Sequence, residues 1–271
     1  MKTVIEAGQS KWKVNLREIF YYRDLLWMLA YRDFKIRYAQ TVLGIVWAVI
    51  QPVFTLLIFI FVFNKAAKID SGSIPYPVFA MTGMWAWSYL SYVITQAGQS
   101  IINAQQLVTK IYFPRLLIPF SKCLAGLIDF SITFVILLIL LISYHVVPPL
   151  QIIALPFIIF ILILLSLSAG IWLSALTIRF RDFQYIIPFL VQIGLYITPI
   201  AYPTSLIPSE YKWIVYLNPM AVLVDAFRWS LLNIPLPEKQ YLLYSLSITV
   251  LLFVSSIFYF RKTESRIADI I

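Results

Sequence analysis

The chain has 271 residues, of which 61% are hydrophobic and only 12% are charged, and its mean hydropathy is +0.87. A soluble domain carries roughly 25% charged residues, so this composition excludes an ordinary water-soluble protein and indicates a protein embedded in a lipid bilayer. The net charge of +9 does not indicate a nucleic-acid partner, because the basic residues cluster between apolar runs. One cysteine and one histidine exclude an intrachain disulfide and disfavour a metal centre or a catalytic triad.

The first 40 residues are predicted to be a cytoplasmic N-terminus, because they contain no early apolar core and no small-residue cleavage site of a signal peptide. Within them, 15–38 has apolar residues at roughly helical spacing among charged ones: Leu16, Ile19, Phe20, Trp27 and Ala30. This pattern predicts an amphipathic helix in the inner interface of the membrane. Such a helix serves anchoring alone, or it also contacts a cytoplasmic partner or an anionic lipid head group; the pattern is compatible with both.

Six apolar segments follow, and each is predicted to cross the membrane as a helix: 41–63, 76–98, 120–143, 150–176, 185–198 and 241–260. The fifth is short for a crossing and precedes an apolar stretch that is broken by Pro199, Pro203, Pro208 and Pro219. Proline breaks helices, and non-helical backbone at membrane depth must be buried in protein or line a wet cavity. We therefore expect two short re-entrant or interfacial helices on the outer side, with a simple loop as the alternative.

The basic residues set the orientation. Most of the 21 Lys and Arg residues lie before the first apolar segment, between the second and third, between the fourth and fifth, or after the sixth. By the positive-inside rule these stretches are cytoplasmic. The predicted fold is thus an all-α polytopic membrane protein with both termini cytoplasmic, a transmembrane domain over 41–260, and a tail over 261–271.

Three stretches carry a resemblance to a known family: RDFKIRYAQTVLGIVWAVIQP at 32–52, RFRDFQYIIPFLVQIGLYITPIAYP at 179–203 and LNPMAVLVDAFRWSLL at 217–232. In this order they resemble permeases of ABC-type polysaccharide exporters (the Wzm-type family), which export lipid-linked O-antigen, capsule or teichoic acid. The resemblance covers nearly the whole chain. It implies a multi-pass protein of the bacterial inner membrane that is not itself an enzyme. It also implies a homodimer that works with two ABC ATPase subunits on a lipid-linked glycan.

The energy source is expected on the separate ATPase subunits. No glycine in the chain begins a G-x-x-x-x-G-K-[ST] phosphate loop, so ATP and Mg are expected on the ATPase, and this chain is expected to carry no cofactor of its own. Two alternatives stay open: an ABC permease of the same architecture for a drug or another lipid, and a membrane protein or membrane-embedded enzyme that works with no ATPase.

Polar and aromatic residues form stripes with steps of three and four, so each stripe shares one helix face. Amides are costly in hydrocarbon, which favours faces that look inward. Aromatic rings stack on sugar rings, so these faces are candidates for a glycan path; helix packing and interfacial aromatic belts are the alternative. The candidate path residues are Trp47, Gln51, Thr82, Trp85, Tyr89, Tyr92, Gln96, Gln99, Tyr185, Phe189, Gln192 and Tyr196.

Charged residues supply two further hypotheses. A lipid diphosphate needs cations at the inner rim, and the candidates are Lys35, Arg37, Arg179 and Arg181. Contact with the ATPase is expected in the stretch 103–119, which mixes polar, basic and apolar residues; a simple loop is the alternative. Its candidate coupling residues are Gln105, Gln106, Lys110, Tyr112 and Arg115.

Two acidic residues have predicted partners on their own helices. Asp129 lies seven residues after Lys122 on the same face, which predicts an indirect pairing near the inner rim. Asp225 and Arg228 lie three residues apart, which predicts a local structural pair. Cys123 and His145 are interpreted as a packing residue and an outer-loop residue.

Overall fold

The computed structural model describes residues 20–39 and 41–264, and within these ranges every regular element is helical. The termini beyond them, including the first part of the predicted N-terminal helix and most of the predicted tail, lie outside the described residues. In chain order the elements are α2 (Arg23–Tyr38), η1 (Gly44–Val46), α3 (Trp47–Phe59), η2 (Ile60–Ala66), α4 (Tyr76–Gly98), α5 (Ser100–Asn103), α6 (Gln105–Lys110), α7 (Leu117–Ser143), η3 (Leu150–Ala154), α8 (Leu155–Arg179), α9 (Phe183–Ile197), η4 (Thr204–Leu206), η5 (Ser209–Tyr211), α10 (Lys212–Tyr216), α11 (Pro219–Leu232) and α12 (Lys239–Glu264).

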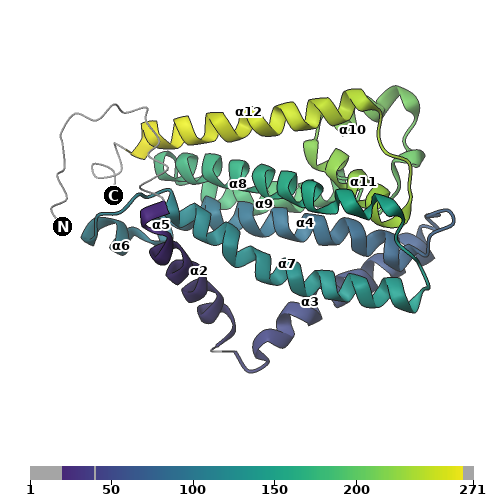
Figure 1. The fold of residues 1–271 in the computed structure, drawn as a ribbon, viewed down its shortest axis with the longest axis horizontal. Helices are drawn as coiled ribbons and strands as arrows, with labels where there is room; N and C mark the ends of the chain where they lie inside the picture. The colour runs from purple at the N-terminus through teal and green to yellow at the C-terminus, as the bar shows by residue number, and fades with distance from the viewer. Residues whose placement is uncertain (1–19, 40, 265–271) are drawn as a thin grey trace.

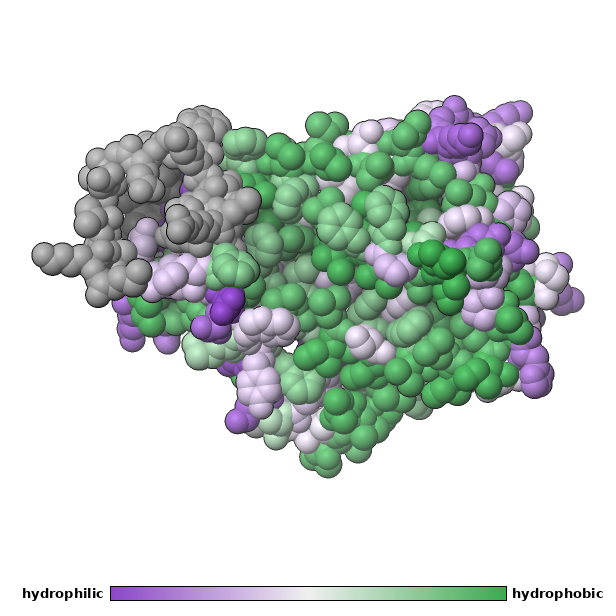
Figure 2. All heavy atoms as spheres, viewed as in Figure 1, coloured by the Kyte–Doolittle hydropathy of each residue, from purple (hydrophilic) through white to green (hydrophobic). Residues whose placement is uncertain are grey.

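Four of the described helical segments are long and apolar enough to cross a membrane: Gly44–Ala66, Leu117–Ser143, Leu150–Arg179 and Lys239–Glu264. Each overlaps a predicted apolar segment. Figure 1 shows the long helices side by side in an elongated bundle. Figure 2 shows a broad hydrophobic surface over the middle of this bundle, with hydrophilic residues towards its ends. This distribution fits a hydrocarbon layer about 30 Å thick between two polar interfaces.

Helix α4 differs from these four because it lies inside the protein. It is 23 residues long and contacts α7, α8, α9 and α11. Its packing is close: a Cβ atom added at Gly170 of α8 would lie 2.8 Å from the Cβ atom of Ala97. Since protein and not lipid surrounds most of α4, the helix accommodates Thr, Ser, Gln and Tyr residues that a lipid-facing helix would not.

The two ends of the bundle differ. Helices α5 and α6, the start of α2 and the end of α12 lie at one end, and α10 and α11 lie at the other (Figure 1). The apolar stretch after α9 contains the 3-10 helices η4 and η5 and two α-helices, α10 and α11. The longer one, α11, begins where the side chain of Asn218 accepts a hydrogen bond from the backbone of Met220, and Pro219 occupies its first position. It ends at Asn233, which has the left-handed φ of 57°.

Candidate functional site

A groove of about 1060 Å³ lies between α3, α4 and α7. Trp47, Gln51 and Phe54 border it on α3, the end of α2 contributes Arg37, and α9 contributes Leu195. The remaining lining residues are Tyr38, Ala48, Ile50, Pro52, Thr55, Met84, Trp87, Ser88, Tyr89, Ser91, Tyr92, Gly126, Asp129, Phe130 and Thr133. Aromatic rings, hydroxyl groups and one amide thus face a common space inside an otherwise apolar bundle.

Two glycines make room for the aromatic side chains of this groove. A Cβ atom at Gly126 of α7 would lie 2.5 Å from the ring of Tyr92, and one at Gly194 of α9 would lie 2.6 Å from the ring of Trp87. Real side chains do not pack that closely, so any larger residue at either position would displace a ring. The wall of the groove therefore depends on small residues in neighbouring helices.

A charged cluster closes the groove at the end of α2. Arg37 forms an ion pair with Asp129 of α7, and its guanidinium lies over the Tyr92 ring, 4.2 Å from the centroid. The Tyr38 hydroxyl donates to the other oxygen of Asp129. Burial, and then this hydrogen bond, raise the pKa of Tyr38 to about 12, so the phenol keeps its proton and acts as a donor. The carboxylate of Asp129 is thus held by two side chains of one helix.

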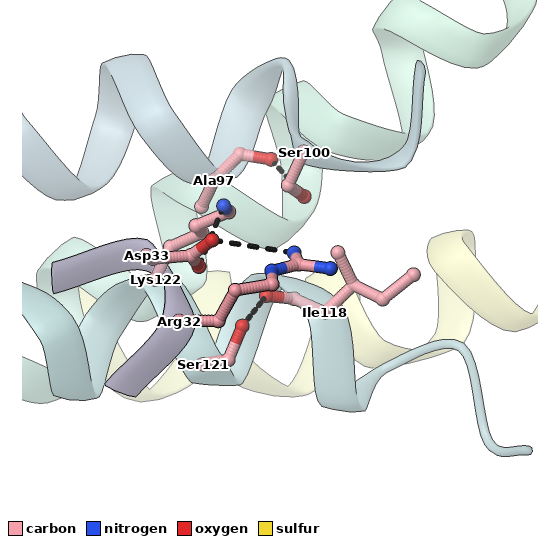
Figure 3. Close-up of polar contacts among 7 residues, drawn as sticks. All are labelled: Arg32, Asp33, Ala97, Ser100, Ile118, Ser121 and Lys122. Atoms are coloured by element: carbon pink, nitrogen blue, oxygen red, sulfur yellow. Dashed lines mark hydrogen bonds and ion pairs between the residues drawn. The ribbon is translucent and has the colours of Figure 1, made fainter. Parts of the chain in front are cut away.

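The predicted indirect pairing of Lys122 with Asp129 is wrong. Lys122 donates instead to Asp33 of α2 across 2.7 Å, and Arg32 approaches the same carboxylate at 3.3 Å (Figure 3). Both side chains of α7 have closer partners on α2, about 90 residues earlier in the chain, so neither depends on the other. Helix α2 is therefore docked on α7 by two ion pairs.

The structure divides the predicted path residues among four environments. Trp47, Gln51, Tyr89 and Tyr92 line the groove. Tyr185, Phe189, Gln192 and Tyr196 lie outside it and form an exposed face of α9. Gln99 follows the last residue of α4 and donates to the carbonyl of Gln184 at 3.2 Å. Gln96 is half-buried.

Thr82 and Trp85 lie in the core. The indole of Trp85 donates to the carbonyl of Phe130 at 2.9 Å, and its ring stacks on Phe130 and Phe134 with centroids 4.5 and 4.6 Å away. The Thr82 hydroxyl donates to the carbonyl of Val78 in its own helix. Within this chain both residues serve packing, which is one of the two alternatives that the stripe left open.

Sequence reasoning missed the neighbouring stripe of α4, which contributes Met84, Trp87, Ser88 and Ser91 to the groove. This stripe has the same spacing as the predicted one and is rotated from it by one residue, about 100° around the helix. Its serines and tryptophan, which are polar or aromatic residues within an apolar helix, could have indicated that this stripe lines a groove. Both stripes contribute to the groove, and nothing in the spacing decides which residues of each stripe face it.

Of the predicted rim cations, only Arg37 borders the groove. Lys35, Arg179 and Arg181 are exposed. Arg179 lies over the ring of Phe180 at 5.0 Å, and it ends α8 on the side of the bundle where α5 and α6 lie.

The predicted coupling residues lie at the end of the bundle that holds α6. Gln105 and Gln106 are exposed on α6. Lys110, Tyr112 and Arg115 line a second hollow of about 520 Å³ together with Arg261 and Glu264. Arg115 donates from its guanidinium to the carbonyl of Glu264 at 2.8 Å, and from its backbone N–H to the Glu264 carboxylate at 3.3 Å. The segment before α7 is thereby tied to the end of α12.

The predicted pair of Asp225 and Arg228 is confirmed at 3.4 Å, and both side chains are buried. Arg228 also donates to the carbonyls of Pro199 and Ile200, each at 2.7 Å, and lies 3.7 Å over the Phe79 ring. These contacts fix the turn after α9. The second oxygen of Asp225 accepts from the Tyr216 hydroxyl at 3.0 Å.

The lining of the groove has no constellation for bond-breaking chemistry, and the described residues contain no group of three His, Cys, Asp or Glu side chains that could hold a metal. Long apolar helices around an aromatic, polar groove define a polytopic helical membrane protein. Residues 24–232 match the family described as ABC-2 type transporter, and the chain belongs to this family.

Curated relatives cover nearly the whole chain. The chain is 29% identical over 262 residues to the O-antigen export system permease protein RfbA of Klebsiella pneumoniae, covering 96% of this chain and 99% of the relative. It is 29% identical over 254 residues to the protein of the same name from Myxococcus xanthus, covering 92% and 96%. It is 24% identical over 240 residues to the polysialic acid transport protein KpsM of Escherichia coli, covering 88% and 93%.

The family and the four spans identify the chain as a multi-pass protein of the bacterial inner membrane. As an ABC-2 permease it is the membrane subunit of a transporter and works with an ABC ATPase subunit.

Proposed function

We propose that the chain is the permease subunit of an ABC transporter that exports a lipid-linked polysaccharide, and specifically O-antigen. The observation that carries the proposal is the groove, in which Trp47, Trp87 and Tyr92 alternate with Gln51 and Ser88. Aromatic faces pack against the apolar faces of sugar rings, and neutral polar groups exchange hydrogen bonds with sugar hydroxyls. Such contacts are weak and repeated, as a conduit requires. The names of the relatives support the same substrate.

The proposed topology has six crossings. The first is formed by α3 continued by η2, the second by α4, the third by α7, the fourth by η3 continued by α8, the fifth by α9 and the sixth by α12. Helices α10 and α11 re-enter from the outer side. An even number of crossings returns the chain to the side where it began, and the start of α2 and the end of α12 lie at the same end of the bundle (Figure 1). The basic residues Arg179, Arg261 and Lys262 lie at that end, which supports a cytoplasmic location for both termini.

A homodimer is part of the proposal. Gln51 on α3 and Gln192 on α9 are exposed, each next to exposed aromatic residues. An amide that faces acyl chains has no hydrogen-bond partner, so contact with lipid is unfavourable there. A second copy that covers these faces gives the amides either protein or glycan as partners. Tyr185, Phe189 and Tyr196 then line the path together with the groove.

The proposed energy source is ATP, bound with Mg on two ATPase subunits. The exposed residues Gln105 and Gln106, with Lys110, Tyr112 and Arg115, are the proposed contacts for these subunits. Because Arg115 is bonded to Glu264, a push on this segment also acts on α12. Lys35, Arg37, Arg179 and Arg181 are the proposed contacts for the lipid diphosphate.

The test is complementation of a strain in which the gene is deleted. The double substitution Trp47→Ala and Gln51→Ala should reduce surface polysaccharide and leave glycan inside the cell. The control is Leu251→Ala, which removes an exposed apolar side chain of α12 and should preserve export. Full export by the double variant at normal protein level would contradict a glycan path along the groove. Unchanged surface glycan in the deletion strain, combined with new drug sensitivity, would replace the polysaccharide by a drug as substrate.

A further inference from the structure

We infer that the groove accepts uncharged stretches of glycan and rejects acidic ones, so that the substrate class of this permease is a neutral polysaccharide. The inference rests on the proposed function, because it assumes that glycan enters the groove. Its basis is the charge and the hydrogen-bond polarity of the groove.

The groove carries no net charge. Among the described residues that line it, Arg37 and Asp129 are the charged ones, and they form an ion pair with each other. An acidic sugar that recruits Arg37 must take it from Asp129, which leaves that carboxylate half-buried without its cation. The exchange replaces one ion pair by another and adds an uncompensated negative charge, so it yields no net attraction.

The serine and threonine hydroxyl groups of the groove are turned into acceptors. Every serine and threonine that lines it donates its proton to a backbone carbonyl of its own helix: Thr55 to Gln51, Ser88 to Trp85, Ser91 to Ser88, and Thr133 to Asp129. The distances are 2.9, 2.8, 3.0 and 2.8 Å. A hydroxyl that has donated in this way offers lone pairs to a ligand and no proton.

Two tyrosines are committed in the same way. Tyr38 donates to Asp129, and Tyr89 donates to the carbonyl of Cys123 at 3.2 Å. Sugar hydroxyl groups are donors and satisfy such acceptors, whereas a carboxylate accepts only and meets lone pairs. The hydrogen-bond polarity of the groove therefore favours a neutral sugar over its acidic counterpart.

The aromatic rings act in the same direction. Trp47, Phe54 and Trp87 border the groove, and the face of an aromatic ring is the negative part of its quadrupole. These faces attract the C–H groups of a pyranose and repel an anion. The neutral donors of the groove, which are the Gln51 amide, the Tyr92 hydroxyl and the indoles, do not replace a cation, because a carboxylate removed from water needs paired charge as well as hydrogen bonds.

The test compares two ligands with the same sugar backbone, a fluorescently labelled oligogalacturonate and its fully methyl-esterified form, in which each carboxylate is replaced by an uncharged methyl ester. The full-length permease is placed in nanodiscs of zwitterionic phosphatidylcholine at 0.15 M salt, and binding is measured by fluorescence anisotropy against empty nanodiscs. The ester should bind at least about tenfold more tightly than the acid. Since the chain carries a net charge of +9, nonspecific attraction works against this result and makes the test stringent.

Two variants sharpen the outcome. Asp129→Asn removes the partner of Arg37 and gives the groove a positive charge, so the preference for the ester should shrink. Arg37→Gln leaves Asp129 unpaired, so the preference should grow. Equal binding of both ligands, or tighter binding of the acid, by the unmodified protein would overturn the inference and leave the proposed function standing. If neither ligand binds, or if Trp47→Ala leaves ester binding intact, the proposed glycan path itself is overturned.

Discussion

Two arginines of this protein have the same local chemistry and different surroundings. Arg228 pairs with Asp225 over the ring of Phe79, and Arg37 pairs with Asp129 over the ring of Tyr92. The side chains of the first pair are 1% and 5% exposed, and those of the second are 32% and 27% exposed. Arg228 also holds two backbone carbonyls, and Arg37 borders a groove.

The difference in exposure means that the Arg228–Asp225 pair is fixed, whereas the Arg37–Asp129 pair can exchange partners. Water cannot solvate a fully buried charge, so the loss of any partner leaves an uncompensated ion in the interior. A pair with about a third of its surface exposed can open, because water replaces the lost contacts and salt screens the attraction. The turn after α9 is therefore rigid. The Arg37–Asp129 contact, which joins the end of α2 to the groove, can open.

The largest effect should follow from Arg228→Ala. It leaves Asp225 without its cation and frees the carbonyls of Pro199 and Ile200, so unfolding should become easier by about 3–5 kcal/mol. Arg228→Lys keeps the charge and loses the planar contact with two carbonyls, so it should fall between Ala and the unmodified protein. The measurement is thermal unfolding of the purified protein in detergent. An unchanged midpoint for the Ala variant would refute the fixed role of this network.

An intermediate effect is expected from Trp85→Phe, with Trp47→Phe as the matched control. The first removes the hydrogen bond to the Phe130 carbonyl and part of a buried ring, which should cost about 1–3 kcal/mol. The second changes a side chain that is 43% exposed and should change stability by no more than about 0.5 kcal/mol. The same unfolding assay separates them. Equal losses for the two variants would mean that the groove is packed as tightly as the core.

The smallest effect should come from the pair at the groove. Arg37→Gln and Asp129→Asn should each cost about 1 kcal/mol or less, with an interaction energy in the double-mutant cycle that falls as salt is raised. The same cycle on Arg228→Gln and Asp225→Asn should give a larger interaction energy with little dependence on salt. A salt-independent interaction between Arg37 and Asp129 would remove the contrast between the two arginines.

Much of the architecture followed from the sequence because the cause is local. The apolar segments are runs of consecutive residues, so their composition alone indicates which parts of the chain leave water, and the structure has helices at each of them. The breaks around Pro199, Pro203 and Pro208 are equally local, since a proline removes a hydrogen bond from its own turn. Asp225 and Arg228 pair because residues three apart share a helix face.

The site depended on contacts between distant segments, and only the tertiary structure decided it. Spacing showed that Trp85 and Tyr92 share a face of α4, but neighbouring helices determine that Trp85 packs in the core and Tyr92 borders the groove. The partner of Lys122 is Asp33, 89 residues away, where no helical spacing reaches. Gly126 has a role only because the Tyr92 ring lies against it. Hydrophobic periodicity is a property of one segment, whereas a groove is a property of the space between several.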